Sequence, residues 1–251
     1  MIDNADNRRL LSRLASDYEI ELEDWQCATM LRHLDLLVEA NSKMNLTRIT
    51  EPYDAIVRHD IDSLLLLPTI QRLGMPNKAI YLDMGTGGGF PGIPLGIASG
   101  MRGLLIDSVQ KKVAAVEGFL EQLALHDQLS AQACRAEELA KHRSSEFDMV
   151  TARAVAEMHV LVEYASPLLK LGGYLIVSKA KIKEEELALG DLTAEIVGLR
   201  RVSRETYELP NDLGHREIIA YEKVAKSKVK LPRNTGMAKH KPIVSLGDNA
   251  K

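Results

Sequence analysis

The chain has 251 residues, 45% of them apolar and 27% charged, and a formal net charge of -3 at pH 7. These values are typical of a globular protein with a substantial core, and they exclude a general attraction for polyanions, so a nucleic-acid surface has to be a local patch. The first residues are polar and every apolar run is too short to span a bilayer, so we expect a cytoplasmic protein that does not enter the membrane. Cys27 and Cys134 stand far apart without the spacing of a zinc or redox pair, which predicts two buried thiols.

The apolar pattern divides most of the chain into two zones. Residues 1–78 carry apolar side chains at helical spacing, without strand patterns, and predict a helical N-terminal cap. Residues 79–224 alternate Val-, Ile- and Leu-rich runs with helical segments, of which the clearest follows the stripe from Val109 to Leu123. Alternating strands and helices predict an α/β domain with a mostly parallel sheet that is covered on both faces.

A glycine-rich stretch, YLDMGTGGGFPGIPLGIA at residues 81–98, follows the first strand pattern and carries five glycines within eight residues. Glycines permit positive φ and close backbone approach, and such a turn between a strand and a helix is where open α/β sheets bind ligands. Asp107 ends the second strand pattern, GLLIDS, and there it can accept hydrogen bonds from a ribose diol. The stretch therefore predicts a site for a ligand that carries a nucleoside, although Asp107 could instead only cap a helix.

Two cofactor classes compete for this loop. The segment DMGTGGG, from Asp83, matches D-x-G-x-G-x-G, the pattern associated with S-adenosylmethionine enzymes, whereas GGGFPG, from Gly87, matches the dinucleotide fingerprint G-x-G-x-x-G. The second match is weaker, because Phe90 and Pro91 stand where a pyrophosphate should approach bare backbone. An NAD(P)-dependent oxidoreductase remains the alternative to an S-adenosylmethionine enzyme.

The end of the chain, residues 225–251, is predicted to form a basic tail. From Lys223 onwards there are eight Lys or Arg against one Asp, a net charge of +7, and no periodicity, so we expect this segment to be ordered only in part. Residues 1–78, by contrast, have nine Lys or Arg and thirteen Asp or Glu, which gives the cap no broad attraction for phosphates.

These motifs resemble the ribosomal small-subunit 16S RNA guanine-N7 methyltransferases, the glucose-inhibited division protein B family, over residues 45–242. The similar segments are NLTRIT, VRHDIDSL, LDMGTGGGFPGIPL, LIDSVQKK, CRAEEL, FDMVTARAVA, LLKLGGYLIVSKA and LPRNTGMAKHKP. The tail departs from the family where Leu231 stands in place of a frequent Tyr. The resemblance implies a class I S-adenosylmethionine-dependent methyltransferase fold, Rossmann-like with a mostly parallel seven-stranded sheet, and methylation of a specific guanine N7 in 16S ribosomal RNA.

The resemblance also implies which residues hold the cofactor. The family uses the glycine loop, an Ala-Glu pair after the third strand and an arginine after the fourth. With the residues of the loop pattern and the second strand end, the predicted cofactor set is Asp83, Gly85, Gly87, Gly89, Phe90, Asp107, Ala136, Glu137 and Arg153. Two alternatives stay open: Arg153 could pair with a surface acid such as Glu157, and Glu137 could serve only the helix that it begins.

The chemistry that the resemblance implies needs no catalytic base, because guanine N7 attacks through a lone pair that carries no proton, and accordingly we name no catalytic residue. His59, Asp60 and Asp62 could suggest a metal site, but they are an incomplete ligand set and we expect no metal. The predicted partner is 16S ribosomal RNA or a small-subunit assembly intermediate, bound by a monomer. A non-catalytic RNA-binding protein of ribosome assembly is a further alternative.

The predicted RNA contacts combine the motif segments with the tail. They are Arg48, Arg58, His59, Lys179, Lys181 and Arg233. We expect removal of the residues after Val224 to weaken RNA binding and to leave the affinity for the cofactor unchanged.

Overall fold

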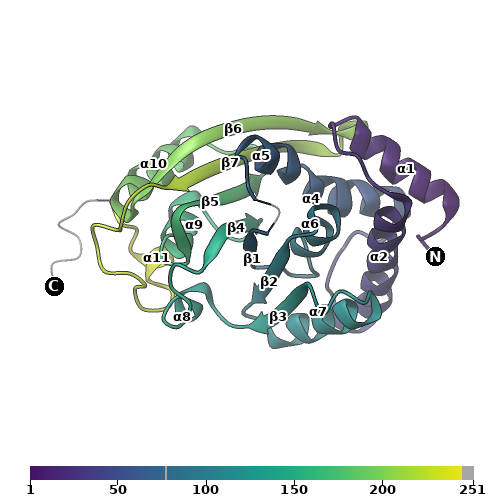
Figure 1. The fold of residues 1–251 in the computed structure, drawn as a ribbon, viewed down its shortest axis with the longest axis horizontal. Coiled ribbons are helices and arrows are strands. Elements are labelled where there is room, and N and C mark those ends of the chain that lie inside the picture. Colours follow the sequence, from purple (N-terminus) through teal and green to yellow (C-terminus); the bar gives the residue numbers. More distant parts are fainter. Residues whose placement is uncertain (77, 245–251) are drawn as a thin grey trace.

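The computed structural model describes residues 1–76 and 78–244, and a seven-stranded sheet runs through the described part of the chain (Figure 1). The strand order is β3-β2-β1-β4-β5-β7-β6. The first five strands in this order are parallel, and β7 runs antiparallel to both β5 and β6. The strands are β1 (Ile80–Met84), β2 (Arg102–Asp107), β3 (Leu129–Ala133), β4 (Phe147–Arg153), β5 (Leu169–Lys179), β6 (Leu199–Leu209) and β7 (Gly214–Lys223).

Helices cover both faces of this sheet. On one side lie α1 (Ala5–Ser16), α2 (Asp24–Met44), α3 (Pro52–Ala55), the π-helix η1 (Ile56–Ile61), α4 (Asp62–Leu64), α5 (Leu66–Arg72), α6 (Gly92–Ser99) and α7 (Gln110–Gln122). On the other side lie α8 (Ala136–Leu139), α9 (Met158–Ala165), α10 (Glu184–Val197) and α11 (Met237–His240), and a short 3-10 turn, η2 (Pro210–Asp212), joins β6 to β7. The mostly parallel seven-stranded sheet and the helical N-terminal region are confirmed. In the part of the chain that the structure describes, no helix is both long and apolar enough to cross a bilayer.

The N-terminal helices share one apolar core with the sheet. Leu34 and Leu37 of α2 and Leu64 of α4 belong to the same buried cluster as Ile93 of α6 and Tyr81 of β1. Burial of this apolar surface is the main interaction that stabilises the packing of the cap on the sheet. The boundary predicted at residue 78 stays a prediction, and the segments on its two sides share this core.

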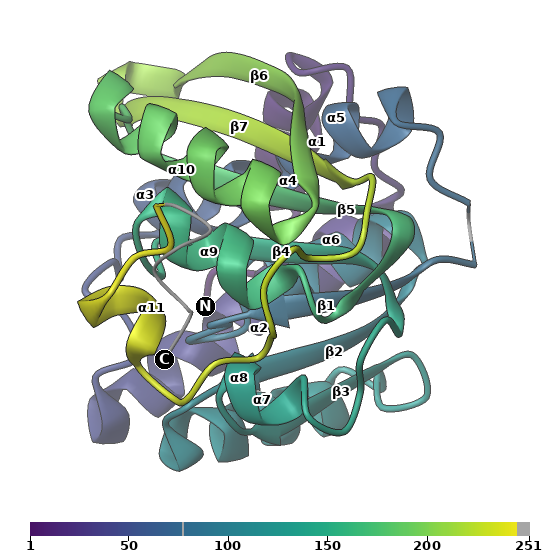
Figure 2. The same ribbon diagram turned by 90° about the vertical axis from the view of Figure 1, so that its left-hand side faces the viewer.

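The described part of the tail is packed against the second face of the sheet. Val224 and Ala225 both donate their backbone N–H to the carbonyl oxygen of Gly198, and the Thr193 hydroxyl donates to the carbonyl oxygen of Ile243. Ile243 itself is fully buried. Figure 2 shows this yellow segment passing along α9 and α10 before it reaches α11. Residues 245–251 of the predicted tail lie outside the described residues.

Candidate cofactor site

The glycine loop between β1 and α6 is anchored by a buried carboxyl group. Asp83 Oδ2 accepts a hydrogen bond of 2.9 Å from the backbone N–H of Gly92, and the Thr151 hydroxyl donates to Asp83 Oδ1 at 3.1 Å. Burial raises the pKa of Asp83 to about 6. A Cβ atom at Gly92 would lie only 2.7 Å from Asp83 Oδ2, so glycine is what lets the start of α6 approach the end of β1.

The middle of the loop turns its backbone over the end of β2. Gly85 and Gly87 have φ of 79° and 58°, conformations that L side chains adopt rarely. Gly85 donates its N–H to the Ile106 carbonyl oxygen at 2.8 Å, and Gly87 donates to Asp107 Oδ2 at 3.1 Å. A Cβ atom at Gly87 would meet no atom within 4 Å, and Gly87 lines a cavity.

That cavity has a volume of about 290 Å³ and lies where the carboxyl ends of the parallel strands meet the loop. Strand order reverses here, since β1 lies between β2 and β4, and such a switch point is where open α/β sheets bind ligands. The residues that line the cavity are Met84, Gly85, Gly87, Ile106, Asp107, Ser108, Lys112, Cys134, Arg135, Ala136, Glu137, Ala154, Val155, Tyr164 and Lys239.

The structure brings five of the nine predicted cofactor residues together around this cavity. They are Gly85, Gly87, Asp107, Ala136 and Glu137. The sequence patterns did not single out Lys112, Arg135 or Lys239 as lining residues. Lys112 lies in the first turn of α7, and Arg135 directly precedes α8. Both are close in sequence to motif residues, and this proximity is the only sequence feature that indicates them.

Asp107 accepts hydrogen bonds from two backbone N–H groups. Its Oδ1 accepts from the Val109 N–H at 2.9 Å, at the start of α7, while Oδ2 accepts from Gly87 as described. A carboxylate offers about four lone-pair positions, so two backbone donors leave capacity for the hydroxyl groups of a ribose. Asp107 therefore holds the glycine loop and the residue before α7, and its binding of a ribose stays a prediction.

Glu137 supplies the second carboxyl group of the cavity, from the start of α8. Its side chain is buried, and Oε1 accepts a hydrogen bond of 2.9 Å from the backbone N–H of Gly236, in the tail. Burial, and next the charge of Glu137, raise the pKa of Tyr164 on the same wall. Because Lys239 also lines the cavity, the tail forms part of its wall. The expectation that removal of the tail leaves the affinity for the cofactor unchanged stays a prediction.

The other four predicted residues, Asp83, Gly89, Phe90 and Arg153, do not line the cavity but support the loop from behind. The Phe90 ring stacks between the rings of His33 and His59, with centroid distances of 4.6 and 4.5 Å. A Cβ atom at Gly89 would lie 2.6 Å from Ile93 Cδ1 and 3.1 Å from His33 Nε2, so a larger residue there would have to displace these side chains. A direct cofactor contact by any of these four stays a prediction.

Arg153 joins the end of β4 to the cap. Its Nη1 donates to Asp62 Oδ2 and to the Arg58 carbonyl oxygen, both at 3.1 Å, and its guanidinium lies 5.4 Å from the centre of the Phe90 ring. The ion-pair partner is therefore Asp62, on the neighbouring α4, and not the surface acid Glu157 that the sequence suggested. Arg216 Nε donates to the other oxygen of Asp62 at 2.8 Å.

The segment RHDIDS forms the π-helix η1 and its junction with α4. His59 is buried, and burial followed by the charge of Arg153 lowers its pKa to about 3, so the ring is neutral and pairs with the Thr47 hydroxyl at 2.9 Å. Asp60 is fully buried, and burial raises its pKa well above the usual range. Among the described residues, no three His, Cys, Asp or Glu lie together in a way that could hold a metal ion.

Three of the six predicted RNA contacts have side chains engaged inside the protein. Lys179 Nζ lies 2.6 Å from Glu186 Oε1, Arg233 pairs with Glu163 through two hydrogen bonds, and His59 is buried. Arg48 and Lys181 are exposed and Arg58 is half-buried. The RNA contacts stay predictions, and exposure favours Arg48, Arg58 and Lys181 among them.

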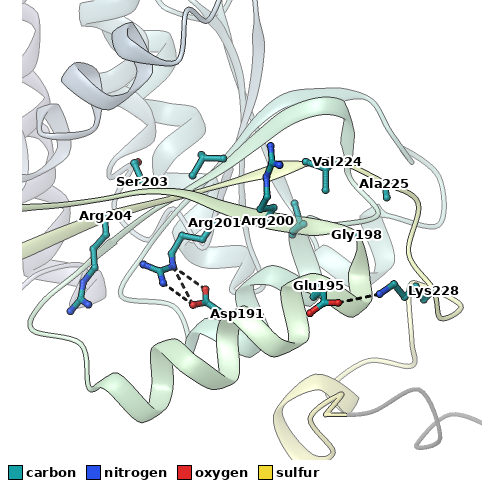
Figure 3. Close-up of a pocket in the computed structure, with 12 residues that line it drawn as sticks. Asp191, Glu195, Gly198, Arg200, Arg201, Ser203, Arg204, Val224, Ala225 and Lys228 are labelled. Atoms are coloured by element: carbon teal, nitrogen blue, oxygen red, sulfur yellow. Dashed lines mark hydrogen bonds and ion pairs between the residues drawn. The ribbon is translucent and has the colours of Figure 1, made fainter.

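A second hollow, of about 820 Å³, lies between β6, α10 and the start of the tail (Figure 3). Its cations are matched by acids: Arg201 pairs with Asp191 at 2.9 Å, and Lys228 lies 3.5 Å from Glu195. None of the predicted cofactor or RNA residues lines it. Because its charges are compensated and it lies on the edge strand β6, we place the functional site in the smaller cavity.

The sheet and its helices form the class I S-adenosylmethionine-dependent methyltransferase fold. Two solved structures show the same fold. A SAM-dependent methyltransferase from Methanosarcina mazei has a TM-score of 0.51 and 15% identity, and the match covers 63% of this chain and 98% of that chain. TrmN from Thermus thermophilus has a TM-score of 0.52 and 13% identity, and the match covers 67% of this chain and 53% of that chain.

Sequence comparison defines the family more narrowly. Residues 26–211 match the model of the GidB family, described as rRNA small subunit methyltransferase G. A protein named Ribosomal RNA small subunit methyltransferase G in Desulfitobacterium hafniense is 38% identical over 95% of this chain and 99% of its own length. The protein of that name in Geobacillus kaustophilus is 39% identical over 84% and 89%. This chain belongs to the rRNA small subunit methyltransferase G family, and its cofactor is S-adenosylmethionine, which decides against the oxidoreductase alternative.

Proposed function

We propose that the protein methylates N7 of a specific guanine in 16S ribosomal RNA. The names of its relatives support a substrate in the RNA of the small ribosomal subunit. The observation that carries the proposal is the cavity itself, which combines a glycine loop without projecting side chains with two carboxyl groups, those of Asp107 and Glu137. This combination suits a ligand that carries a ribose and a net positive charge.

S-adenosylmethionine supplies the methyl group, bonded to a sulfonium sulfur. When bound, the cofactor would offer this carbon to the guanine N7 lone pair, and the carbon–sulfur bond would break as the positive charge moves from sulfur to the guanine ring. No proton moves in this step, so the chain has to supply alignment, which is worth on the order of 7 to 11 kcal/mol when the reacting atoms are held near attack geometry.

The residues of the cavity can provide that alignment. Asp107 accepts from the ribose hydroxyl groups, and Ala136 with Glu137 borders the place for the adenine. Gly85 and Gly87 allow the backbone of the loop to approach the methionine part closely. Asp83 and Phe90 keep the loop in this conformation from behind.

Three cations at the rim of the cavity provide a surface for RNA phosphates. Lys112, Arg135 and Lys239 come from three different segments, and none of them takes part in an ion pair within the described ranges. The cofactor itself carries a net positive charge, so unpaired cations do not attract it. They do attract a polyanion such as RNA. With Arg48, Arg58 and Lys181 they form the RNA surface that we propose.

Mass-spectrometric mapping of 7-methylguanosine in ribosomal RNA tests the reaction. One methylated guanine of 16S RNA should disappear in cells that lack the protein, and purified protein with labelled S-adenosylmethionine should restore it on unmodified small subunits or their naked RNA. Identical maps with and without the protein would contradict the proposal. Methyl transfer to that RNA by the purified protein would also exclude a purely non-catalytic role in assembly.

A salt series tests the RNA surface. Replacing Lys239 by Gln should weaken RNA binding and lower the slope of log affinity against log salt by about 0.7 to 0.9, because one RNA phosphate is no longer neutralised by the protein. The matched control is Lys241→Gln, which removes an equal charge two residues away, outside the cavity. Equal slopes for the two variants would remove Lys239 from the proposed surface.

A further inference from the structure

The C-terminal segment is docked beside the cofactor cavity by a buried ion pair. Arg233 Nε lies 2.8 Å from Glu163 Oε1, and Arg233 Nη2 lies 2.5 Å from Glu163 Oε2, in a two-pronged contact with α9. The two side chains are only 10% and 4% exposed. A bidentate arginine–carboxylate pair fixes direction as well as distance, so this contact defines how the chain enters residues 234–240.

Three residues further on, the same segment reaches the cavity. Gly236, with φ of 84°, donates its backbone N–H to Glu137 Oε1, and it begins the short helix α11. Ala238 is buried against the second face of the sheet, and Lys239 lines the cavity. The segment thus contributes both a donor to a cavity carboxyl group and a part of the cavity wall.

The position of Glu137 depends on this donor. A buried carboxyl group without hydrogen-bond donors is costly, so a backbone donor such as Gly236 N–H stabilises the position of this one. Glu137 stands in a helix of only four residues, so its own helix offers it little support. The Gly236 N–H, on the segment that Arg233 docks, donates to this carboxyl group, and Tyr164 lies beside it on the same wall.

We propose that residues 232–240 are a wall of the S-adenosylmethionine site, in which Arg233 and Gly236 are positioning residues that act on the cofactor through Glu137. Docking of this segment therefore sets the affinity for the cofactor. The inference extends the proposed function at the same cavity, and it depends on the cofactor and not on the RNA target.

Calorimetric titration of the full chain with S-adenosylmethionine, without RNA, tests the inference. Arg233→Gln should weaken the affinity roughly tenfold or more, the effect of losing one hydrogen bond to a charged group, and Arg233→Lys should recover part of it. Lys241→Gln, which removes a cation of the same segment outside the cavity, should stay within about twofold of the parent. The titrations are made well below the thermal midpoint of each variant, so that loss of folding is separated from loss of positioning.

Unchanged affinity in a folded Arg233→Gln variant would overturn the inference. If that variant does not fold, hydrogen exchange of the unmodified protein decides the question: saturating S-adenosylmethionine should slow exchange of the backbone amides in residues 233–240, because a ligand and a segment that stabilise each other must do so reciprocally. Equal exchange with and without the cofactor would also overturn it. Neither outcome bears on which guanine is methylated, so a failure here is distinct from a failure of the proposed reaction.

Discussion

Arg153 Nη1 and Asp62 Oδ2 lie 3.1 Å apart and join the end of a central strand to the N-terminal cap. Their side chains are 15% and 5% exposed, and Arg216 shares the same carboxyl group. The loop that borders the candidate cofactor cavity contacts this junction through Phe90, whose ring packs against the Arg153 guanidinium. The contact therefore connects the stability of the cap with the shape of the site.

Replacing Asp62 by Asn should lower the free energy of unfolding by about 3 to 5 kcal/mol, because two largely buried guanidinium groups lose their counter-charge. Urea unfolding followed by circular dichroism measures the change. The control is Asp6→Asn, which breaks the exposed pair with Arg9 and should change stability by about 0.5 kcal/mol or less. Similar small losses in both variants would show that the buried junction does not stabilise the fold.

Asp83 should make the stability of the protein fall as pH rises through the acid range. Its pKa is about 6 in the folded chain against 3.8 for the ordinary group, so the folded state binds this proton more tightly than the unfolded state does. The resulting contribution to the free energy of unfolding is complete below about pH 3.8 and is lost as the pH rises through about 6. Between pH 4 and 7 the parent should lose on the order of 2 to 3 kcal/mol relative to Asp83→Asn, which cannot ionise. Urea unfolding of both proteins at a series of pH values gives the difference. A difference that does not vary with pH would mean that Asp83 has an ordinary pKa.

Gly87→Ala should remove most cofactor binding while the protein stays folded. The new methyl group enters open space on the cavity side, and the positive φ costs about 1 to 2 kcal/mol. Gly100→Ala is the matched control, because Gly100 also has a positive φ and open space but lies at the end of α6, outside the cavity. Calorimetry should give at least a tenfold loss of affinity for the first variant only. Equal affinities would place the cofactor away from the loop.

Asp107→Ala should weaken binding by about 1.5 to 3 kcal/mol, the usual effect of removing a hydrogen bond to a charged group. If the missing partner is the ribose, the affinity for adenosine should fall by the same factor as that for S-adenosylmethionine. Competition titrations with both ligands measure the two factors. Unchanged dissociation constants would leave Asp107 with its contacts to Gly87 and Val109 alone.

The sequence predicted the parts of this molecule that depend on local pattern. Strand and helix periodicity indicated the α/β sheet with its N-terminal helices, and the glycines with Asp107 indicated the ligand loop. Pattern could not separate residues that face the cavity from residues that hold the loop. Asp83 and Phe90 belong to the motif as much as Gly87 does, yet their neighbours are Thr151, His33 and His59, which lie far away in the sequence.

Long-range pairing also explains what was missed. A charge run such as the tail is commonly solvated, and nothing in its own composition indicates that Arg233 has a buried partner 70 residues earlier. The same holds for Arg153, whose partner is Asp62 across the cap and not the acid nearest in sequence. The ion-pair partner of a charged side chain can therefore be identified only from the folded structure.

The contact between Gly236 and Glu137 spans 99 residues, and it has a consequence for how the protein is made. On the ribosome the strands, the glycine loop and Glu137 are all synthesised well before residues 232–240 emerge. A nascent chain can therefore complete its sheet while one wall of the cavity is still missing. If residues 232–240 form a wall of the site, a growing copy that lacks them should bind the methyl donor more weakly than the finished chain does.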